Sequence, residues 1–449
     1  MIDASPMTSA AQAPLMLSLF GFLKARGIPY VLLGDTTTEQ LNDRENDYDL
    51  VLPHEVLSDG GAWIRAFCLQ RGAMLVQALQ HEATAIYYVL AERGTDGYHY
   101  YKVDCCSNYG RAGRIFLSAE QLLADAQTID HDVQVPSVPN AFIYYLLKKI
   151  SKPHPITDIG YLQQLWGRAR TACKIEIKRF FTAENNARDI VEALDGGDAG
   201  ALEQRREGLR RALWRSPAVH KNVCDEALRR MRRLVQPTGL MLAVLGPDGS
   251  GKSTVMAEVE ARLANAFRHT RTYHLRPPLF GQRGDGAPVV NPHGEVPRGV
   301  GASLLKLLYW WTEYWVGYWL TIKPAMIRST LVLFDRYYDD LFIDPKRYRW
   351  GMSLSLPRWG RLFVPKPDMT FILLADVETL WARKKEVAKT ELDGLVDAYR
   401  AWGNEQGYRI IDAGRDVNAV AGEIEESILI SMAERMAQRS SASPQSTAT

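Results

Sequence analysis

Residues 246–254 read Gly-Pro-Asp-Gly-Ser-Gly-Lys-Ser-Thr and match the phosphate-binding pattern G-x-x-x-x-G-K-[ST]. The glycines let the backbone curl so that successive N–H groups point toward one anion. Lys252 adds a mobile positive charge for the β- and γ-phosphates of a nucleotide, and Ser253 offers a hydroxyl group to Mg²⁺. This segment therefore predicts a site for a nucleoside triphosphate and its metal ion.

The elements that flank the loop are those that such a site requires. Residues 240–245 form a short apolar run that suits a buried parallel strand, and residues 254–267 place apolar side chains at helical spacing. A strand, a glycine loop and a helix in this order put the phosphates at a helix N-terminus, where unpaired N–H groups favour them. The alternative is a chance glycine-rich turn, and the strand–helix frame argues against it.

Two further segments carry charges suited to phosphate chemistry. Residues 330–334 form an apolar strand, and Asp335 and Arg336 follow it directly. A carboxylate at a strand end beside the loop is suited to hold Mg²⁺, and an adjacent arginine can clamp a second phosphate. Residues 377–389 predict a helix whose Arg383 and neighbouring lysines can close over the transferred phosphate. A plain ion pair and a solvated helix face are the alternatives.

The order of these parts has a family likeness. Residues 240–430 resemble thymidylate kinase and its nucleoside-monophosphate kinase relatives. The resemblance rests on residues 246–254, on Asp335-Arg336-Tyr337, on Pro367-Asp368 before a strand, on Arg383, and on residues 410–413 before a final helix. It implies an α/β fold with a parallel five-stranded sheet flanked by helices, ATP with Mg²⁺ as the donor, and a monophosphate as the acceptor.

The resemblance also implies roles for individual residues. The expected nucleotide-binding residues are Gly246, Asp248, Gly249, Ser250, Gly251, Lys252, Ser253 and Thr254. Lys252 and Ser253 would hold ATP and Mg²⁺, and Asp248 would reach toward the acceptor or the metal. Asp335 would position Mg²⁺ and Arg336 would bind the acceptor phosphate. Arg383 would stabilise the transferred group, so that Lys252, Asp335, Arg336 and Arg383 form the expected catalytic set.

The chain departs from this family where the family reads its base. Residues 338–349 carry acidic residues and an Arg-Tyr-Arg cluster instead. The acidic stretch could face sugar hydroxyls, and Arg347 with Arg349 could bind another phosphate. The acceptor therefore stays open between a nucleoside monophosphate and a sugar or phosphosugar.

A second set of carboxylates lies near the N-terminus. Asp47 and Asp49 are two positions apart and share one face of a predicted strand, and Asp104 lies near the end of a later strand. Three such carboxylates predict a metal site. The pattern resembles the nucleotidyltransferase fold, from which Asp35 departs because the family has Gly or Ser there. The alternative is a scaffold that only binds or folds.

The length and composition fit several soluble domains. The chain has 449 residues, 46% of them hydrophobic, and a net charge of +2. Five cysteines without a C-x-x-C pair and no secretion signal favour a cytoplasmic protein without disulfides. The predicted domains are a nucleotidyltransferase-like α/β domain (1–135), a helical region (136–236), a thymidylate kinase-like domain (237–435) and a disordered tail (436–449).

Two segments raise the question of binding to a membrane, to a second copy of the chain or to nucleic acid. Residues 304–322 are rich in Trp, Tyr and Leu but contain Lys306 and Glu313, which favours a core or homodimer-interface helix over a membrane-associated one. Residues 203–235 are helical and rich in arginine, but acidic residues offset the charge. Binding of nucleic acid is therefore not expected.

Three hypotheses follow. The favoured one is a phosphotransferase that uses the C-terminal half. The second is a nucleotidyltransferase that uses Asp47 and Asp49, and the third is an interaction protein gated by a nucleotide.

Overall fold

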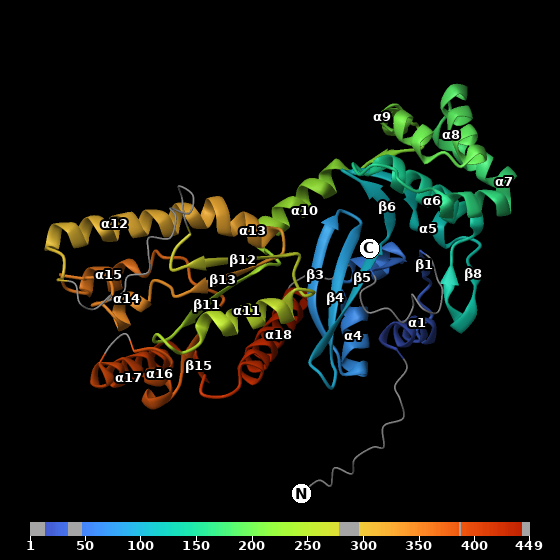
Figure 1. Ribbon diagram of the computed structural model, residues 1–449. Coiled ribbons are helices and arrows are strands. Elements are labelled where there is room, and N and C mark those ends of the chain that lie inside the picture. Colours follow the sequence, from blue (N-terminus) through green and yellow to red (C-terminus); the bar gives the residue numbers. More distant parts are fainter. Residues whose placement is uncertain (1–13, 35–46, 278–295, 386–387, 442–449) are drawn as a thin grey trace, which may run out of the picture. The chain divides into compact units, whose positions relative to one another are not determined.

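A computed structural model describes residues 14–34, 47–277, 296–385 and 388–441 (Figure 1). The chain divides into two compact units. The first unit comprises residues 1–231 and 432–449, and the second comprises residues 232–431. Each unit is described by itself.

The first unit is built on a mixed five-stranded sheet. In spatial order its strands are β1 (Val31–Leu33), β2 (Asp47–Val51), β5 (Tyr98–Cys106), β4 (Ala85–Arg93) and β3 (Met74–Glu82). β2 and β5 are parallel, and the other pairs are antiparallel. β2 and β5 lie where the sequence predicts the strands that carry Asp47, Asp49 and Asp104, whereas β3 was not predicted.

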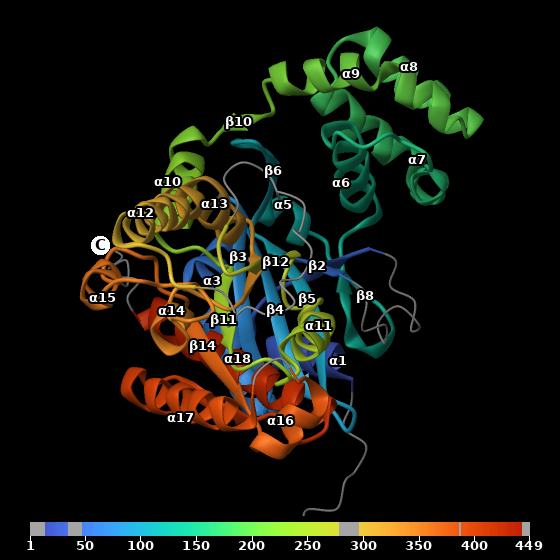
Figure 2. The same cartoon turned by 60° about the vertical axis from the view of Figure 1, so that its left-hand side comes forward.

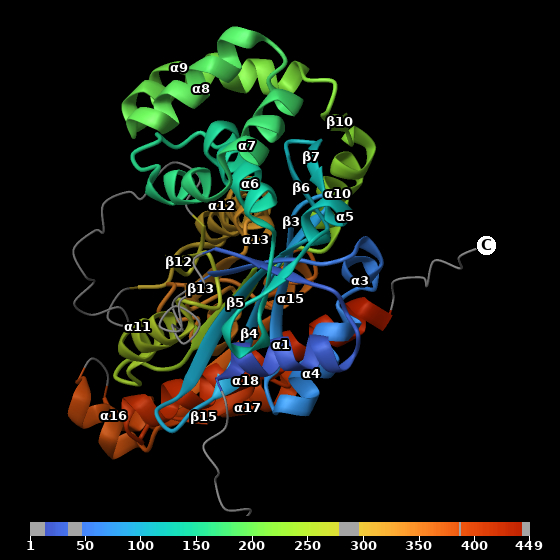
Figure 3. The same ribbon diagram turned by 90° about the vertical axis from the view of Figure 1, so that its right-hand side faces the viewer.

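Both faces of this sheet are covered by helices (Figure 3). Leu32 and Leu50 face a core that contains α1 (Leu15–Ala25) and α4 (Ala62–Arg71). Their neighbours Val31 and Val51 face the core of a helical bundle. Because side chains alternate across a strand, each short strand serves both cores.

The bundle consists of four helices. They are α6 (Val138–Ser151), α7 (Gly160–Phe180), α8 (Glu184–Gly196) and α9 (Ala199–Arg215). Arg206 and Arg210 on α9 pair with acidic residues three positions before them, at 3.0 and 2.7 Å. These arginines thus form ion pairs along the helix surface.

The rest of the first unit consists of short elements. The strands are β6 (Asn108–Arg111), β7 (Arg114–Ser118), β8 (Gln127–Thr128), β9 (Gln134–Val135) and β10 (His220–Lys221). The helices are α3 (His54–Ser58), α5 (Ala119–Leu123), the 3-10 helix η1 (Asp130–Asp132) and α10 (Val223–Val235), whose last residues belong to the second unit. β10 and a break at residue 216 divide the helical stretch expected over 203–235.

The second unit has the parallel five-stranded sheet that the sequence predicts. Its order is β12 (His269–His274), β13 (Thr330–Asp335), β11 (Leu240–Leu245), β14 (Met369–Leu374) and β15 (Arg409–Asp412). All four strand pairs are parallel. β11 lies at the centre and is buried along its whole length, which explains its continuous apolar sequence.

Helices lie on both sides of this sheet. Figure 2 shows α11 (Lys252–Leu263) and α12 (Val300–Gly317) on opposite sides of the strands. Trp310 and Tyr314 of α12 pack with Met241 of β11 and with Trp402 of another helix. The remaining helices are the π-helical η2 (Tyr318–Ile322), α13 (Lys323–Ile327), α14 (Asp340–Ile343), α15 (Ser355–Gly360), α16 (Val377–Arg383), α17 (Lys389–Gln406) and α18 (Val417–Ser441).

The aromatic segment 304–322 packs one face on the core of the second unit. Glu313 is buried and pairs with Arg276 at 2.6 Å, and Lys306 donates to the carbonyl of Tyr348 at 2.8 Å. The two charges that interrupt the apolar run therefore have protein partners. Among the described helices, none combines the length and the apolarity needed to cross a bilayer. The homodimer through this segment stays a prediction.

The chain end differs from the expected tail at 436–449. α18 continues through Ser441, into the stretch where the sequence predicts a disordered tail. Met436 is 4% exposed and belongs to the core of the first unit. Burial of this side chain explains why the first residues of the expected tail are helical.

Candidate functional site

The phosphate-binding loop has a backbone that only glycine adopts easily. Gly246, Gly249 and Gly251 have φ angles of 149°, 83° and 81°. A Cβ atom on Gly246 would lie 2.5 Å from the carbonyl oxygen of Leu373, and one on Gly249 would lie 2.8 Å from that of Leu380. The loop thus runs close to neighbouring backbone on two sides, and its glycines are sterically required.

Lys252 begins α11 and is turned into this loop. Its Nζ donates to the carbonyl oxygens of Gly246 and Pro247, each at 2.9 Å, and the residue is 7% exposed. Burial and the charge of Arg336 lower the pKa of Lys252 to about 7. A phosphate beside this ammonium group would favour its charged form, so the geometry suits a polyanionic ligand. The next residues, Ser253 and Thr254, are exposed in the first turn of α11.

Asp335 lies at the end of β13, the strand next to β11. Its Oδ2 is 3.2 Å from Nδ1 of His274, its register partner on β12. Burial opposes ionisation of Asp335, but His274, Lys252 and Arg336 outweigh it and lower the pKa. Within the described residues its Oδ1 is buried without a hydrogen-bond partner. An ionised carboxylate with one unsatisfied oxygen fits a divalent cation.

Arg336 is held in a position that the sequence did not predict. It has a φ angle of 70°, is 2% exposed, and lies between two carboxylates. One guanidinium nitrogen donates to Asp248 at 2.6 Å and the other donates to Asp340 at 2.8 Å. Arg336 therefore ties the phosphate-binding loop to the end of β13. Its role as an open clamp for the acceptor phosphate stays a prediction, because both nitrogens already have carboxylate partners.

A buried polar network continues from Arg336. Asp340 is fully buried and also accepts hydrogen bonds from the hydroxyls of Tyr348 at 2.7 Å and Tyr399 at 2.5 Å. Burial opposes the charge of Asp340, but Arg336 and the two hydroxyls hold its pKa below the usual range. Sequence reasoning missed this network. The only signal was the acidic residue four positions after Arg336, a separation short enough for an ion pair within one turn of the chain.

Asp248 has a second cationic partner. Arg347 contacts its Oδ2, and Arg336 contacts its Oδ1. Burial raises the pKa of Asp248, but the two arginines outweigh it and hold the pKa well below the usual range. Asp248 thus stays ionised and joins the loop to two separate segments of the chain.

The acidic stretch at 338–349 differs from the expected sugar-facing surface. Asp339 is buried and accepts hydrogen bonds from Arg361 at 2.8 Å and Trp402 at 3.1 Å. Asp340 lies in the network described above. Both carboxylates therefore stabilise the interior of the second unit, since buried carboxylates require cationic or hydrogen-bonding partners.

The expected cationic lid is shorter than the sequence suggests. α16 ends at Arg383, and α17 begins at Lys389, so the predicted helix over 377–389 is divided. Arg383 donates to the carbonyl oxygen of Ala413 at 3.0 Å. The last turn of α16 approaches the loop, because the carbonyl oxygen of Leu380 is the atom that a Cβ on Gly249 would meet first. The contact of Arg383 with a transferred phosphate stays a prediction.

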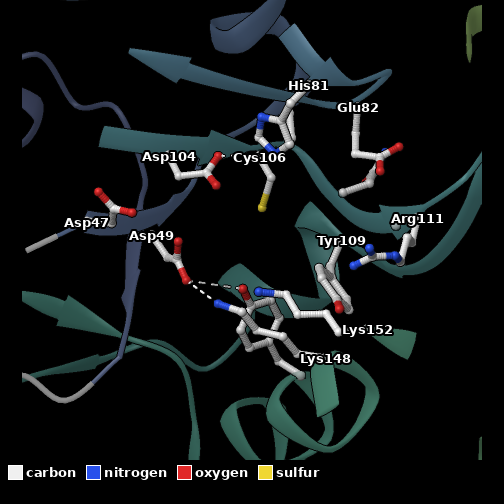
Figure 4. Close-up of a pocket in the computed structure, with 14 residues that line it drawn as sticks. Asp47, Asp49, His81, Glu82, Asp104, Cys106, Tyr109, Arg111, Lys148 and Lys152 are labelled. Atoms are coloured by element: carbon white, nitrogen blue, oxygen red, sulfur yellow. Dashed lines mark hydrogen bonds and ion pairs between the residues drawn. The ribbon is translucent and has the colours of Figure 1, made fainter. Parts of the chain in front are cut away.

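The three carboxylates of the first unit line one pocket of about 360 Å³ (Figure 4). Asp49 pairs with Lys148 at 2.5 Å, and Asp47 accepts a hydrogen bond from Tyr87 at 3.0 Å. Asp104 lies 3.5 Å from the ring of a histidine on β3.

Two of the three carboxylates that the sequence predicts as metal ligands thus have protein partners. In the described segments no three His, Cys, Asp or Glu side chains are grouped closely enough to hold a metal ion. A lysine and a tyrosine engage two of the three carboxylates, and the metal site of Asp47, Asp49 and Asp104 stays a prediction. Asp35 lies outside the described residues. The nucleotidyltransferase-like nature of this unit stays a prediction.

Comparison with known proteins identifies the second unit. A family model described as thymidylate kinase matches residues 244–420. A probable thymidylate kinase of Pyrobaculum aerophilum is 28% identical over 194 residues, which cover 42% of this chain and 95% of the relative. A thymidylate kinase of Thermomicrobium roseum is 30% identical over 202 residues, which cover 40% of this chain and 89% of the relative. The chain therefore belongs to the thymidylate kinase family through its second unit, and it is an ATP-dependent kinase.

Proposed function

We propose that the second unit transfers the γ-phosphate of MgATP to a nucleoside 5′-monophosphate, with dTMP as the first candidate. The observation that carries this proposal is the placement of Lys252 and Asp335 at the carboxyl ends of two adjacent parallel strands. Val244, two residues before the loop, is the register partner of Asp335. Ligands of open α/β sheets bind at these strand ends.

The loop and the strand end divide the work of binding MgATP. The loop N–H groups and Lys252 hold the phosphates, and Ser253 with Asp335 holds Mg²⁺, which would neutralise charge on the phosphates. Asp335 suits this role because it is ionised and has an oxygen without a partner in the described part of the chain. Phosphoryl transfer depends mainly on positioning of the reactants and on electrostatic stabilisation of the transferred group. The loop, Lys252 and Asp335 can supply both.

Two observations favour a nucleoside monophosphate as the acceptor. The relatives named above are thymidylate kinases or probable thymidylate kinases. The stretch 338–349 also turns its carboxylates inward, which removes the reason for expecting sugar hydroxyls there. Arg347 remains on the open side of the network, with its side chain 21% exposed, and it suits the acceptor phosphate.

The test follows release of ADP by the full chain with MgATP and a panel of nucleoside monophosphates. We expect dTMP to accelerate release. Lys252→Ala should abolish turnover, and Asp335→Asn should lower kcat by about 100-fold or more. Lys178→Ala, an exposed lysine on α7, is the matched control and should leave the rate unchanged.

Each part of the proposal can fail separately. Unchanged turnover in Lys252→Ala would refute the assignment of the loop as the donor site. If dTMP is inert while another monophosphate accelerates ADP release, the donor site stands and the acceptor assignment is wrong. If ADP is released only once per protein with every acceptor, the chain is a nucleotide-gated binding protein.

A further inference from the structure

The pocket of the first unit is a cavity that the kinase function does not use. It is about 360 Å³ in volume, and it lies outside residues 244–420, which match the kinase family. Its walls come from β2, β3, β4, β5, β6, α6 and the residue that follows α6. A cavity of this size can hold a small polar metabolite.

One side of the pocket is cationic. Lys148 lies on α6, Lys152 follows the last residue of this helix, and Arg111 enters from β6 (Figure 4). Lys148 is engaged by Asp49. Arg111 lies near the carboxylate of Glu82, which also lines the pocket, whereas within the described segments the amine of Lys152 has neither a hydrogen bond nor an ion pair. Burial and the nearby charges of Lys148 and Arg111 lower the pKa of Lys152. An anion placed between Lys152 and Arg111 would compensate these charges.

The other side of the pocket is anionic. β2 and β5 run parallel, and Asp49 is the register partner of Asp104, so both carboxylates leave the sheet on the same face. Figure 4 shows these two residues and Asp47 on the side of the pocket away from Arg111. Carboxylates accept hydrogen bonds from hydroxyl groups and repel a phosphate, which fixes the orientation of a ligand that carries both.

We propose that this pocket is a second binding site, separate from the kinase site, for a small phosphomonoester with free hydroxyl groups. Lys152 and Arg111 bind the phosphate, and Asp47 and Asp104 bind the hydroxyls. Free sugar phosphates and ribonucleoside monophosphates share this chemistry. Glu82 adds one carboxylate beside Arg111, but the three aspartates gather at the other end of the cavity, so a ligand with an anionic and a hydroxylated end matches it better than a purely anionic ligand.

The test is calorimetric titration of the full chain, without ATP or Mg²⁺. Ribose 5-phosphate and AMP are separate arms that distinguish the two sources of the ligand, and ribose and inorganic phosphate test each end alone. We expect at least one phosphomonoester to bind more tightly than ribose or inorganic phosphate.

Substitutions of single residues test whether the phosphomonoester binds in this pocket. Lys152→Gln should weaken binding by about 10-fold or more, since a charge-assisted hydrogen bond is lost, and Lys152→Arg should restore most of it. Lys149→Gln removes the same charge from a position on α6, outside the pocket, and should have no effect. Lys252→Ala should also have no effect, which separates this site from the kinase site.

Several results would overturn the proposal. One is the absence of binding by both phosphomonoesters up to about 1 mM. Another is binding that Lys252→Ala removes and Lys152→Gln leaves intact. In a separate titration of the Lys252→Ala variant, binding of MgATP that Asp49→Asn abolishes would assign the pocket to nucleotidyl transfer instead. Circular dichroism of each variant, together with the rescue by Lys152→Arg, distinguishes lost binding from lost folding.

Discussion

Replacing Asp340 by Asn tests whether the buried network stabilises the second unit. Asp340 is fully buried and accepts hydrogen bonds from Arg336, Tyr348 and Tyr399. Asn keeps the size of the side chain but removes the charge that faces Arg336 and places an amide donor among three donors. We expect the second unit to lose stability while the first unit is unaffected.

The expected loss of stability depends on how many carboxylates remain beside Arg336. Removing one member of a buried ion pair costs about 3–5 kcal/mol, because the other charge stays buried and uncompensated. Here Asp248 still faces Arg336 at 2.6 Å, so the lower end, about 3 kcal/mol, is expected. A loss of about 3 kcal/mol makes the opening of the second unit that exposes its backbone amides to solvent roughly 100-fold more favourable.

Hydrogen–deuterium exchange measures this change within the unit concerned. Peptides from the central strands β11 and β13 should exchange roughly 100-fold faster in Asp340→Asn, whereas peptides from β5 of the first unit should keep their rates. Asp393→Asn is the matched control, because Asp393 is exposed on α17, the helix that carries Tyr399. Exchange of β11 within about threefold of the control, under 1 kcal/mol, would refute the reasoning.

The remaining predictions concern the loop, the pH dependence and the acceptor. Gly249→Ala should abolish binding of ATP in a fluorescent-nucleotide assay, because the added Cβ meets a carbonyl oxygen at 2.8 Å, whereas Gly301→Ala, with no atom within 4 Å, should bind normally. The pKa values of Asp248 and Asp340 are lower in the folded protein, so their stabilisation is complete above the ordinary carboxyl range and is lost as the pH falls below about 4. The protection of β11 amides, corrected for the intrinsic exchange rate at each pH, should therefore fall between pH 5 and pH 3, and an equal fall in Asp340→Asn would contradict this cause. Arg347→Ala should raise KM for the acceptor by about 10-fold or more while KM for ATP changes little, and the reverse pattern would exclude Arg347 from the acceptor site.

Local sequence patterns were sufficient for the elements that depend on short-range physics. The loop at 246–254 lies between a buried strand and a helix, as predicted, because its glycines and the flanking apolar spacing act within about 25 residues. α17 also carries a readable pattern, since Leu392, Val396 and Tyr399 recur at helical spacing on its buried face, although the helix was not predicted. β3 was harder to predict because two register irregularities interrupt its pairing with β4 and its alternation of side chains.

In the candidate site, too, local sequence identifies some of the residues, whereas contacts between residues far apart in the chain could not be predicted. The sequence could name Asp335 and Arg336 as charged residues at a strand end, because a carboxylate after an apolar strand is a local signal. It could not show that Arg336 faces Asp248, which is 88 positions away, or that Tyr399 closes the network from α17. In the first unit, Lys148 engages Asp49 across 99 positions, a contact that the sequence did not show.

The sequence by itself determined the donor chemistry of this protein, because the phosphate-binding loop is a continuous segment whose backbone requires glycine. It also indicated the central strands β11, β13 and β14, because strands buried on both faces are apolar along their length, whereas the five-stranded parallel order was implied by the family resemblance. Only the tertiary structure decided which charges are open to a ligand and which are satisfied inside the protein. The physical reason is that the cost of a buried charge depends on partners that folding brings together from distant segments.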